Sequence, residues 1–336
     1  MTRAGLARFM GVELEYRAEL MDLISDFFCS RGIKMSEKNR VQACVPAGAK
    51  ALVNNVGTAP GIMAEHEGKM FVCLPGVPIE MKRMFEESVS GKLEGLGAGQ
   101  VVLTRRVKCF GAGESTIAQM LGDLMERGRN PLVNCTVSGG VITLHVVGTA
   151  AEKSVAEAMV EKEITGICEI LGDLVYSRDD ETLGEVVGRQ LCERGRTLAV
   201  AESCTGGLLG KLLTDVPGSS EYFVCGWVTY SNSAKINELG VEEGVIEEYG
   251  AVSEKVAGAM ASGCRVRSGA DFGIGITGIA GPGGSSEEKP VGLVYIGVDF
   301  GGRVEVKRYV FSHSREHIRR RAALTALNIL RLGMDD

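Results

Sequence analysis

The stretch LAVAESCTGGLLGKLL, residues 198–213, decides the fold expected for the second half of the chain. Its opening residues, 198–201, form an apolar run of the kind found in buried strands. A pair of glycines then marks a turn, and leucines follow at helical spacing over 208–213. The stretch therefore predicts a strand, a sharp turn and a helix, with two candidate nucleophiles, Ser203 and Cys204, at the turn.

Residues 186–336 continue this alternation of strands and helices. Strand patterns occur in TLAVAE, YFVCGWVTY, FGIGITGIAG, GLVYIGVDF and VEVKRYVF, and we expect helices to begin at Gly206, Ser253 and Arg315. An α/β fold with a three-layer α/β/α sandwich accommodates this order. Its glycine-rich loops follow strand ends, where folds of this class bind ligands.

The first segment, residues 1–97, indicates a partial α/β domain. A helical pattern covers residues 20–28, and a short buried strand, MFVCL at 70–74, leads into another turn and helix. A doubly wound domain needs several parallel strands with crossover helices, and only two or three strands are credible here. We therefore predict half a domain, which ends at the glycine-rich break of residues 91–100.

The second segment, residues 98–176, predicts a small α+β module. Its order of strand, helix, hairpin and helix is typical of ferredoxin-like or KH-like modules. KH domains that bind RNA clamp its backbone with a GxxG loop between helices, which this segment lacks, so a spacer or dimerising module is favoured. The polar stretch 176–185 follows as a linker, and Asp180 or Thr182 is placed to cap the first helix of the third domain, residues 177–336.

Composition restricts the class of protein. The 336 residues suggest two or three domains, and a net charge of -6 without a basic block disfavours nucleic-acid binding. The ten cysteines form no CxxC pair, so we expect reduced thiols and neither a zinc site nor a redox motif. No continuous apolar segment is as long as the core of a signal peptide or as the ~18 apolar residues of a membrane span. These features predict a soluble, cytoplasmic protein without membrane association.

Ser203 is the first candidate for chemistry. The backbone N–H groups of Thr205, Gly206 and Gly207 are expected to point out of a helix N-terminus and to bind an anion or an oxyanion. The alternative is that Ser203 or Thr205 merely caps the helix, which is the commoner role of serine at that position. Cys204 ranks below Ser203 because a thiolate needs a base, and the histidines of the last segment lie on another element.

Lys235, in WVTYSNSAKINELG at 227–240, is the candidate base for Ser203. A desolvated lysine can lose its proton near neutral pH and activate a serine hydroxyl. Tyr230 is expected to hold either partner through its phenol. The alternative is a solvated surface lysine, which most lysines are.

Two further motifs are candidates for substrate binding. The loop TGIAGPGGSSEEKPVG, residues 277–292, allows close backbone approach to a ligand, or is simply a long flexible connection. Arginines in the first turns of the last helix oppose the helix dipole, so they are candidates for holding phosphate, or for a solvated basic face. The substrate-binding residues predicted from these motifs and from the turn are Thr205, Gly206, Gly207, Thr277, Gly278, Gly281, Arg315 and Arg319, with Arg320 beside them.

Residues 177–336 closely resemble the C-terminal domain of the CinA family, the PncC-type nicotinamide-nucleotide amidohydrolases. The matching motifs, in order, are AESCTGG, VTYSNSAK, GAVSE, TGIAGPGGSSEEKPVG and SREHIRR. The resemblance implies hydrolysis of the carboxamide of nicotinamide mononucleotide to nicotinic acid mononucleotide and ammonia. It also implies that Ser203 is the nucleophile and that Tyr230 and Lys235 are its partners. No cofactor is expected for this reaction.

The earlier segments resemble the later half of the molybdopterin-binding-like (MoCF) domain of the same family and its KH-like domain. The motifs NRVQACVPAGAKALVNNVGTAPGI and LPGVPIEMKRMF carry the first resemblance, while the GDE-type turn and the GGLGPT-type loop of the family's opening half do not occur. In full-length relatives this domain is associated with metal-dependent ADP-ribose pyrophosphatase activity. We therefore expect a divalent metal only if that site survives.

Two classes of function follow. One is the amidohydrolase, and the other is a nucleotide-binding or competence-related interaction protein without turnover. A binding module has no need of a lysine base beside a serine, so the set Ser203, Tyr230 and Lys235 favours the enzyme. The expected partner is a small nucleotide substrate, and we expect a homodimer.

Overall fold

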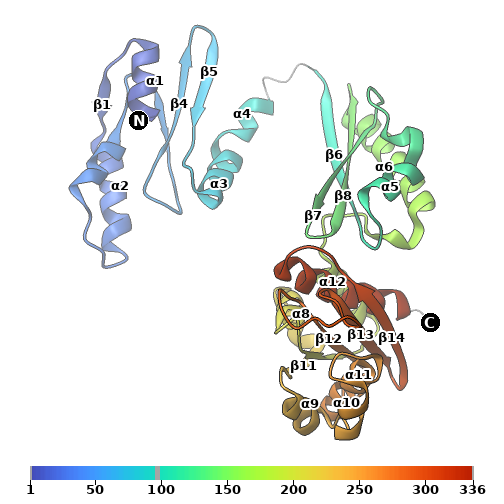
Figure 1. The fold of residues 1–336 in the computed structure, drawn as a ribbon. Coiled ribbons are helices and arrows are strands. Elements are labelled where there is room, and N and C mark those ends of the chain that lie inside the picture. The colour runs from blue at the N-terminus through green and yellow to red at the C-terminus, as the bar shows by residue number, and fades with distance from the viewer. Residues whose placement is uncertain (1, 95–98, 335–336) are drawn as a thin grey trace. The chain divides into compact units, whose positions relative to one another are not determined.

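The computed structural model describes residues 2–94 and 99–334 and divides the chain into two compact units (Figure 1). Unit 1 is Met1–Gly99 and unit 2 is Gln100–Asp336. Unit 2 holds both the predicted middle module and the predicted α/β/α domain. The domain boundary predicted at residues 97–98 lies outside the described residues.

Unit 1 consists of short elements around two small sheets. Its helices are α1 (Thr2–Met10), α2 (Ala18–Cys29), α3 (Pro78–Ser88) and α4 (Ser90–Glu94), and its strands are β1 (Leu14–Tyr16), β2 (Cys44–Pro46), β3 (Lys50–Leu52), β4 (Gly61–His66) and β5 (Lys69–Cys73). Strands β1 and β2 pair, and β3, β4 and β5 form an antiparallel sheet. The strand predicted as buried, residues 70–74, is only half-buried, because β5 is an edge strand of this sheet.

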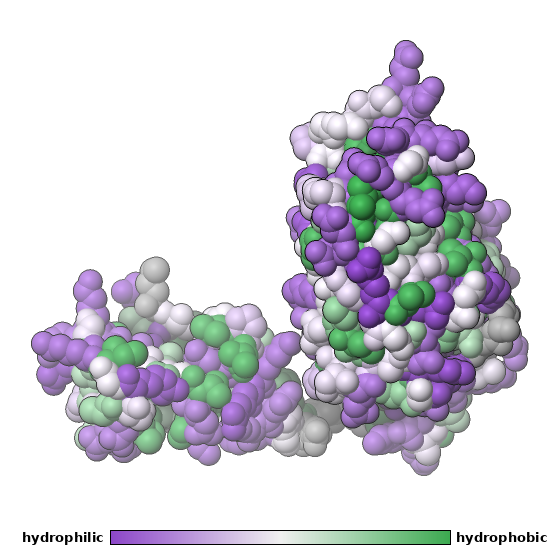
Figure 2. Space-filling view, turned by 90° about the horizontal axis from the view of Figure 1, so that it is seen from below, coloured by the Kyte–Doolittle hydropathy of each residue, from purple (hydrophilic) through white to green (hydrophobic). Residues whose placement is uncertain are grey.

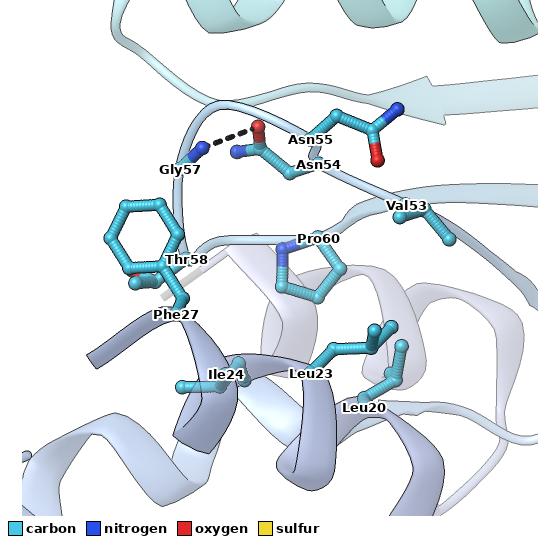
Figure 3. Close-up of a pocket in the computed structure, with 10 residues that line it drawn as sticks. All are labelled: Leu20, Leu23, Ile24, Phe27, Val53, Asn54, Asn55, Gly57, Thr58 and Pro60. Atoms are coloured by element: carbon cyan, nitrogen blue, oxygen red, sulfur yellow. Dashed lines mark hydrogen bonds between the residues drawn. The ribbon is translucent and has the colours of Figure 1, made fainter. Parts of the chain in front are cut away.

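Unit 1 also contains a small apolar pocket of about 90 Å³ (Figure 3). Leu20, Ile24 and Phe27 of α2 form one wall, and the loop of residues 53–60 forms the other. The side-chain Oδ1 of Asn54 accepts the N–H of Gly57 at 2.9 Å, which shapes that loop. The polar groups at this pocket are thus partly occupied with turn formation.

The first part of unit 2 is the predicted α+β module. It comprises β6 (Val101–Cys109), α5 (Glu114–Leu121), β7 (Leu132–Ser138), β8 (Val141–Ala150), α6 (Lys153–Leu171) and β9 (Val175–Ser177). The sheet order is β7-β8-β6-β9, and α5 and α6 lie together on one side of the sheet (Figure 1). Alternate residues of β8, such as Ile142, Leu144 and Val146, are buried beneath these helices.

The second part of unit 2 is the predicted three-layer sandwich. Its strands are β10 (Leu198–Glu202), β11 (Phe223–Val228), β12 (Phe272–Gly278), β13 (Leu293–Phe300) and β14 (Arg303–Val310), and its helices are α7 (Leu183–Glu193), α8 (Leu208–Thr214), α9 (Asn232–Leu239), α10 (Glu243–Tyr249), α11 (Glu254–Ser268) and α12 (Arg315–Gly333). The sheet order is β11-β10-β12-β13-β14, with the first three strands parallel and the last two antiparallel.

Strand β10 shows why the sheet is covered on both faces. Leu198 and Val200 join the core beneath α7, α8 and α12, whereas Ala199 and Ala201 join the core beneath α9, α10 and α11. Side chains alternate across a strand, so the apolar run read in the sequence supplies both cores at once. The predicted α/β/α sandwich is confirmed.

Most helix starts follow the cap signals, including α11, which begins at Glu254 directly after its N-cap Ser253, and α8 differs. Thr182 caps α7 in a capping box with Glu185, while the other cap candidate, Asp180, pairs with Lys108 at 2.7 Å. Helix α12 begins at Arg315 as predicted. Helix α8 begins at Leu208 and not at Gly206, because both glycines of the turn have positive φ angles and reverse the chain first.

The face of the molecule drawn in Figure 2 is largely polar. On the side drawn in Figure 2, hydrophilic residues cover most of the surface and hydrophobic ones occur in small groups. Among the helices of the described residues, none combines the length and the apolar character that crossing a membrane requires. Exposed apolar residues are therefore scattered on this side, as is usual for a globular surface.

Candidate active site

The turn between β10 and α8 presents Ser203 at the edge of the parallel strands. The Ser203 N–H donates to the Ile276 carbonyl of β12 at 3.0 Å, which continues the strand pairing up to the serine. Gly206 and Gly207 then adopt φ angles of +57° and +91°, values that side chains disfavour. Ser203 is 8% exposed. The strand and the turn thus fix the hydroxyl at a nearly buried position.

The carboxylate of Glu202 fills the N-terminus of α8. It accepts the N–H groups of Gly207 and Leu209, each at 3.0 Å, and that of Gly210 at 2.8 Å. Glu202 is 1% exposed, so these bonds form away from water. A buried carboxylate at a helix N-terminus satisfies orphan donors and interacts favourably with the helix dipole. Glu202 therefore holds the shape of the turn that carries Ser203.

This carboxylate corrects one prediction. The N–H groups of Gly206 and Gly207 do not point outward as an anion site, because Gly206 donates to the Ser203 carbonyl at 3.1 Å and Gly207 donates to Glu202. The N–H groups of Cys204 and Thr205 have no acceptor among the residues that the structure describes. Within the turn, these two N–H groups are therefore the ones that the described residues leave without an acceptor.

Lys235 of α9 lies buried beside Ser203. Its Nζ is 3.2 Å from Ser203 Oγ, 2.9 Å from the Thr229 carbonyl and 3.4 Å from the Tyr230 carbonyl, and the residue is 1% exposed. Within residues 2–94 and 99–334, no carboxylate forms an ion pair with Lys235. Burial lowers the pKa of Lys235 below its usual 10.5, because water does not stabilise its charged form.

The three partners of Lys235 Nζ can all accept a hydrogen bond, which suits the three N–H donors of an ammonium group and also permits the neutral amine. A neutral amine has two N–H donors and one lone pair, and two carbonyls together with one hydroxyl surround Nζ. The carbonyls of Thr229 and Tyr230 can take the two N–H groups, which leaves the lone pair for the Ser203 hydroxyl. We call Ser203, Lys235 and the groups around them the Ser203–Lys235 site.

Cys204 lies next to the nucleophile turn and is 5% exposed. Burial raises the pKa of its thiol to about 12. A thiol with so high a pKa is protonated at neutral pH and is a poor nucleophile. The geometry therefore ranks Cys204 below Ser203, in the same order as the sequence.

Tyr230 contributes to the site in a different way from the one expected. Its phenol oxygen accepts a hydrogen bond from Arg315 Nη2 at 3.2 Å and makes none with Ser203 or Lys235. The residue is 62% exposed. Only its backbone carbonyl reaches Lys235. The other nitrogen of the same guanidinium, Nη1, donates to the Gly281 carbonyl at 2.7 Å. Arg315 thus joins the tyrosine to the glycine-rich loop.

Arg319, one turn further along α12, reaches the nucleophile turn. Its Nε and Nη2 donate to the Thr205 carbonyl at 3.2 and 2.6 Å. Among the described residues, neither Arg315 nor Arg319 pairs with a carboxylate. The structure therefore brings two cations without counter-ions to the Ser203–Lys235 site.

Thr277, Gly278 and Gly281, the remaining predicted binding residues, make contacts within the chain. Thr277 is 1% exposed and donates to the Ala251 carbonyl at 2.7 Å. A Cβ at Gly278 would lie 2.7 Å from the Leu293 carbonyl, so only glycine fits against the neighbouring strand. Gly281 has a φ of +75° and offers its carbonyl to Arg315.

Sequence reasoning missed two residues of the site. Glu202 stands directly before Ser203, and a carboxylate ahead of a helix start is a recognisable cap signal. Thr229 has no such signal in the sequence, because it contacts Lys235 through its backbone carbonyl, which every residue has. The buried hydroxyls of Thr205 and Thr229 have no partner among the described residues. Buried polar atoms without partners are uncommon and occur where a ligand or water binds.

Three sequence families match consecutive parts of the chain. The CinA C-terminal domain matches residues 180–334, the damage-inducible protein CinA KH domain matches residues 104–177, and a family described as "probable molybdopterin binding domain" matches residues 1–95. Together these matches extend over both units.

Similar proteins carry related names. A protein of Moorella thermoacetica named "Putative competence-damage inducible protein" is 44% identical over 331 residues, which is 98% of this chain and 80% of that protein. A "CinA-like protein" of Gloeothece citriformis is 42% identical over 336 residues, again with 98% and 80% covered. Among solved structures, a competence damage-inducible protein A of Klebsiella pneumoniae is 36% identical, with a TM-score of 0.45 over 46% of this chain and 95% of its own. With relatives of such identity along nearly its whole length, the chain belongs to the CinA family of competence/damage-inducible proteins.

Proposed function

We propose that the Ser203–Lys235 site hydrolyses the carboxamide of nicotinamide mononucleotide and releases nicotinic acid mononucleotide and ammonia. One observation carries this proposal: Lys235 Nζ lies 3.2 Å from Ser203 Oγ in a nearly dry environment. A buried lysine without a carboxylate partner, beside a serine on a sharp turn, is the arrangement of a Ser-Lys acyl-transfer enzyme. A module that only binds nucleotides has no use for it.

The first half of the reaction forms an acyl-enzyme. Neutral Lys235 accepts the proton of the Ser203 hydroxyl while Oγ attacks the carboxamide carbon. We assign the stabilisation of the resulting oxyanion to the N–H groups of Cys204 and Thr205 as part of this proposal. The protonated amine of Lys235 then returns the proton to the amide nitrogen, the C–N bond breaks, and ammonia leaves.

The second half restores the enzyme. A water molecule takes the place of ammonia, Lys235 accepts one of its protons, and the hydroxide attacks the ester carbonyl. Collapse of the second tetrahedral intermediate breaks the bond to Ser203 Oγ, which recovers its proton from Lys235. The product is the carboxylic acid of the same nucleotide. No step is routed through a metal ion.

Substrate charge supports the choice of a nucleotide. Arg315 and Arg319 are the nearest cations on α12, and their known partners are carbonyls and a phenol. A phosphate group would supply an anionic partner for these guanidinium groups. Arg315 also holds Tyr230 and the glycine-rich loop, so binding of the phosphate and the order of these two segments are linked.

Residual ADP-ribose pyrophosphatase activity has less support. That chemistry needs a divalent metal, and among the residues that the structure describes no three His, Cys, Asp or Glu side chains come together as metal ligands. We therefore assign no metal-dependent step to unit 1.

The direct test is ammonia release from nicotinamide mononucleotide by the purified full chain, measured with a coupled assay for ammonia. We expect turnover by the wild-type protein and none above background by the Ser203→Ala variant. Nicotinamide riboside, which lacks the phosphate, serves as the matched substrate and is expected to react with a higher KM. A folded wild-type chain that binds the nucleotide without releasing ammonia would favour the non-catalytic alternative.

A further inference from the structure

A cavity of unit 2 lies between the α+β module and the start of α12. Its volume is about 640 Å³, which is within the range of roughly 300–1,000 Å³ of small-molecule sites. Four segments form its walls: residues 111–114 at the start of α5, the β7–β8 turn, residues 310–313, and the first turns of α12. None of its lining residues belongs to the Ser203–Lys235 site. We call it the module cavity.

The side chains that line the module cavity are mainly cationic or able to become so. They include His313, His317 and Arg321, with the two imidazole rings 4.9 Å apart. Glu114 is the acidic residue on the wall, and its carboxylate accepts the Cys135 thiol at 3.3 Å. The lining thus contains one permanent cation, Arg321, one carboxylate, and the ring nitrogen atoms of two histidines.

Arg321 lacks an ionic partner. Its Nη1 donates to the Gly140 carbonyl at 2.8 Å, and its guanidinium lies over the Phe110 ring at 4.8 Å. Among the described residues, no carboxylate forms an ion pair with it. Burial lowers the pKa of Arg321, and burial together with nearby His313 and Arg321 lowers the pKa of His317. Partly buried like charges without a counter-ion cost free energy, which a bound anion would offset.

Backbone segments at the start of α5 and at the β7–β8 turn also line the module cavity. No side chain caps α5 at Gly113, so N–H groups of its first turn remain available to an anion. Gly139 and Gly140 of the β7–β8 turn have φ angles of +58° and +89°. A Cβ on Gly140 would also collide with the Arg321 side chain, so glycine lets this turn approach α12. The cations and the backbone donors therefore converge on one space.

We propose that the module cavity binds a phosphorylated small molecule through Arg321, His317 and His313. A phosphate offers three acceptor oxygens, which suits one forked guanidinium and two ring N–H donors. Val137, Ile142 and Phe311 also line the cavity and provide an apolar surface for the rest of the ligand. A net charge of -6 disfavours a polyanion such as a nucleic acid at this place.

The test is isothermal titration of the full chain with inorganic phosphate, pyrophosphate and AMP. We expect at least one probe to bind, and His317→Gln and Arg321→Gln each to weaken it by about tenfold or more, the usual effect of losing a charge-assisted hydrogen bond. His145→Gln is the matched control, because His145 lies on β8 of the same module but does not line the cavity. The affinity of this variant for the probe should stay at the wild-type value.

Other outcomes would overturn the proposal. If none of the three probes binds, or if the two variants bind as the wild type does, the cavity is not a phosphate site. Binding that is lost in Arg315→Ala but kept in His317→Gln would place the anion at the Ser203–Lys235 site. A short single-stranded oligonucleotide that binds more tightly than every small probe, with the same dependence on His317, would indicate nucleic acid instead. If Arg321→Gln does not fold, His313→Gln and His317→Gln decide the outcome.

Discussion

Helix α12 carries two pairs of arginines with different partners. Arg315 and Arg319 reach the Ser203–Lys235 site, where they donate to the carbonyls of Gly281 and Thr205. Arg320 and Arg321 lie against the β7–β8 turn, where Arg321 donates to the Gly140 carbonyl. Successive helical residues point about 100° apart, so Arg320 and Arg321 point away from the direction of Arg319 although they follow it directly in sequence. Residue type alone therefore does not assign an arginine to the site. The face of the helix on which the arginine lies decides which partners it reaches.

The two places also differ in the burial of their titratable groups. Lys235 is 1% exposed and contacts only carbonyls and a hydroxyl, whereas His313 and Arg321 line an open cavity. Burial of one amine favours its neutral form and so its use as a base. A guanidinium group such as that of Arg321 suits the binding of an anion. Substitutions at the two places should therefore give different kinetic signatures.

The largest effect is expected for Ser203→Ala. Loss of the nucleophile should lower kcat for nicotinamide mononucleotide by about three or more orders of magnitude. Cys204→Ala is the control on the same turn, and it should cost far less, because the buried thiol with a pKa of about 12 is protonated. Steady-state ammonia release measures both. An acyl group trapped on Cys204, detected by mass spectrometry, would reverse the assignment.

Lys235→Met should also lower kcat by about two to four orders of magnitude, since it removes the base and keeps the length of the side chain. The affinity for the product nucleotide should change little, because Lys235 is not assigned to substrate binding. Titration calorimetry checks that affinity in the same preparation. A variant that keeps near-wild-type turnover would show that water, or another group, activates Ser203.

A smaller effect, on KM, separates the two pairs of arginines. Arg315→Ala should raise KM by about tenfold and change kcat less, as expected when a phosphate contact is lost from bound substrate and transition state alike. Arg321→Gln should leave KM for the substrate near its wild-type value, because Arg321 lies at the module cavity. Initial rates over a range of nucleotide concentrations measure both variants. Equal KM changes in the two variants would contradict the separation of the two sites.

The sequence predicted the sandwich because its strands have clear signals. The apolar run 198–201 and the cap candidate Thr182 depend on local patterns, which hold in the structure, and the helix expected from Ser253 begins one residue later, with Ser253 as its N-cap. The partners within the site depend on three-dimensional contacts and could not be read in the same way. The Tyr230 phenol, expected to contact Ser203 or Lys235, is bonded to Arg315, which is 85 residues away in sequence.

The turn shows the same limit at shorter range. Two glycines before a helix predict free N–H groups, and Gly207 indeed precedes α8. Glu202, five residues earlier in sequence, takes up that N–H group and two more, because the reversal of the chain brings its carboxylate to the helix start. A local pattern gives the donors, but only the path of the chain shows which acceptor occupies them.

The smallest effect that we expect is a pH dependence of the free energy of unfolding that arises from the titration of Lys235. Burial lowers its pKa below the usual 10.5, so between the lowered pKa and 10.5 the unfolded chain binds more protons than the folded protein. The free energy of unfolding therefore gains a term that rises with pH in this window, by at most about 1.4 kcal/mol per pH unit. Below the lowered pKa both states are protonated, and the slope from this residue vanishes.

Buried thiols change stability with pH in the opposite direction, and they set the highest pH at which the effect of Lys235 is measured. Burial raises the pKa of Cys109, Cys204 and Cys264 to about 12, so the unfolded chain loses these protons first and stability falls as pH rises above their usual 9.0. The difference between wild type and Lys235→Met, taken from denaturant unfolding at a series of pH values below 9, removes the thiol contributions. We expect the wild type to gain stability relative to the variant as pH rises. A difference that stays constant with pH would mean that Lys235 titrates alike in both states, and the neutral amine would lose its support as the base for Ser203.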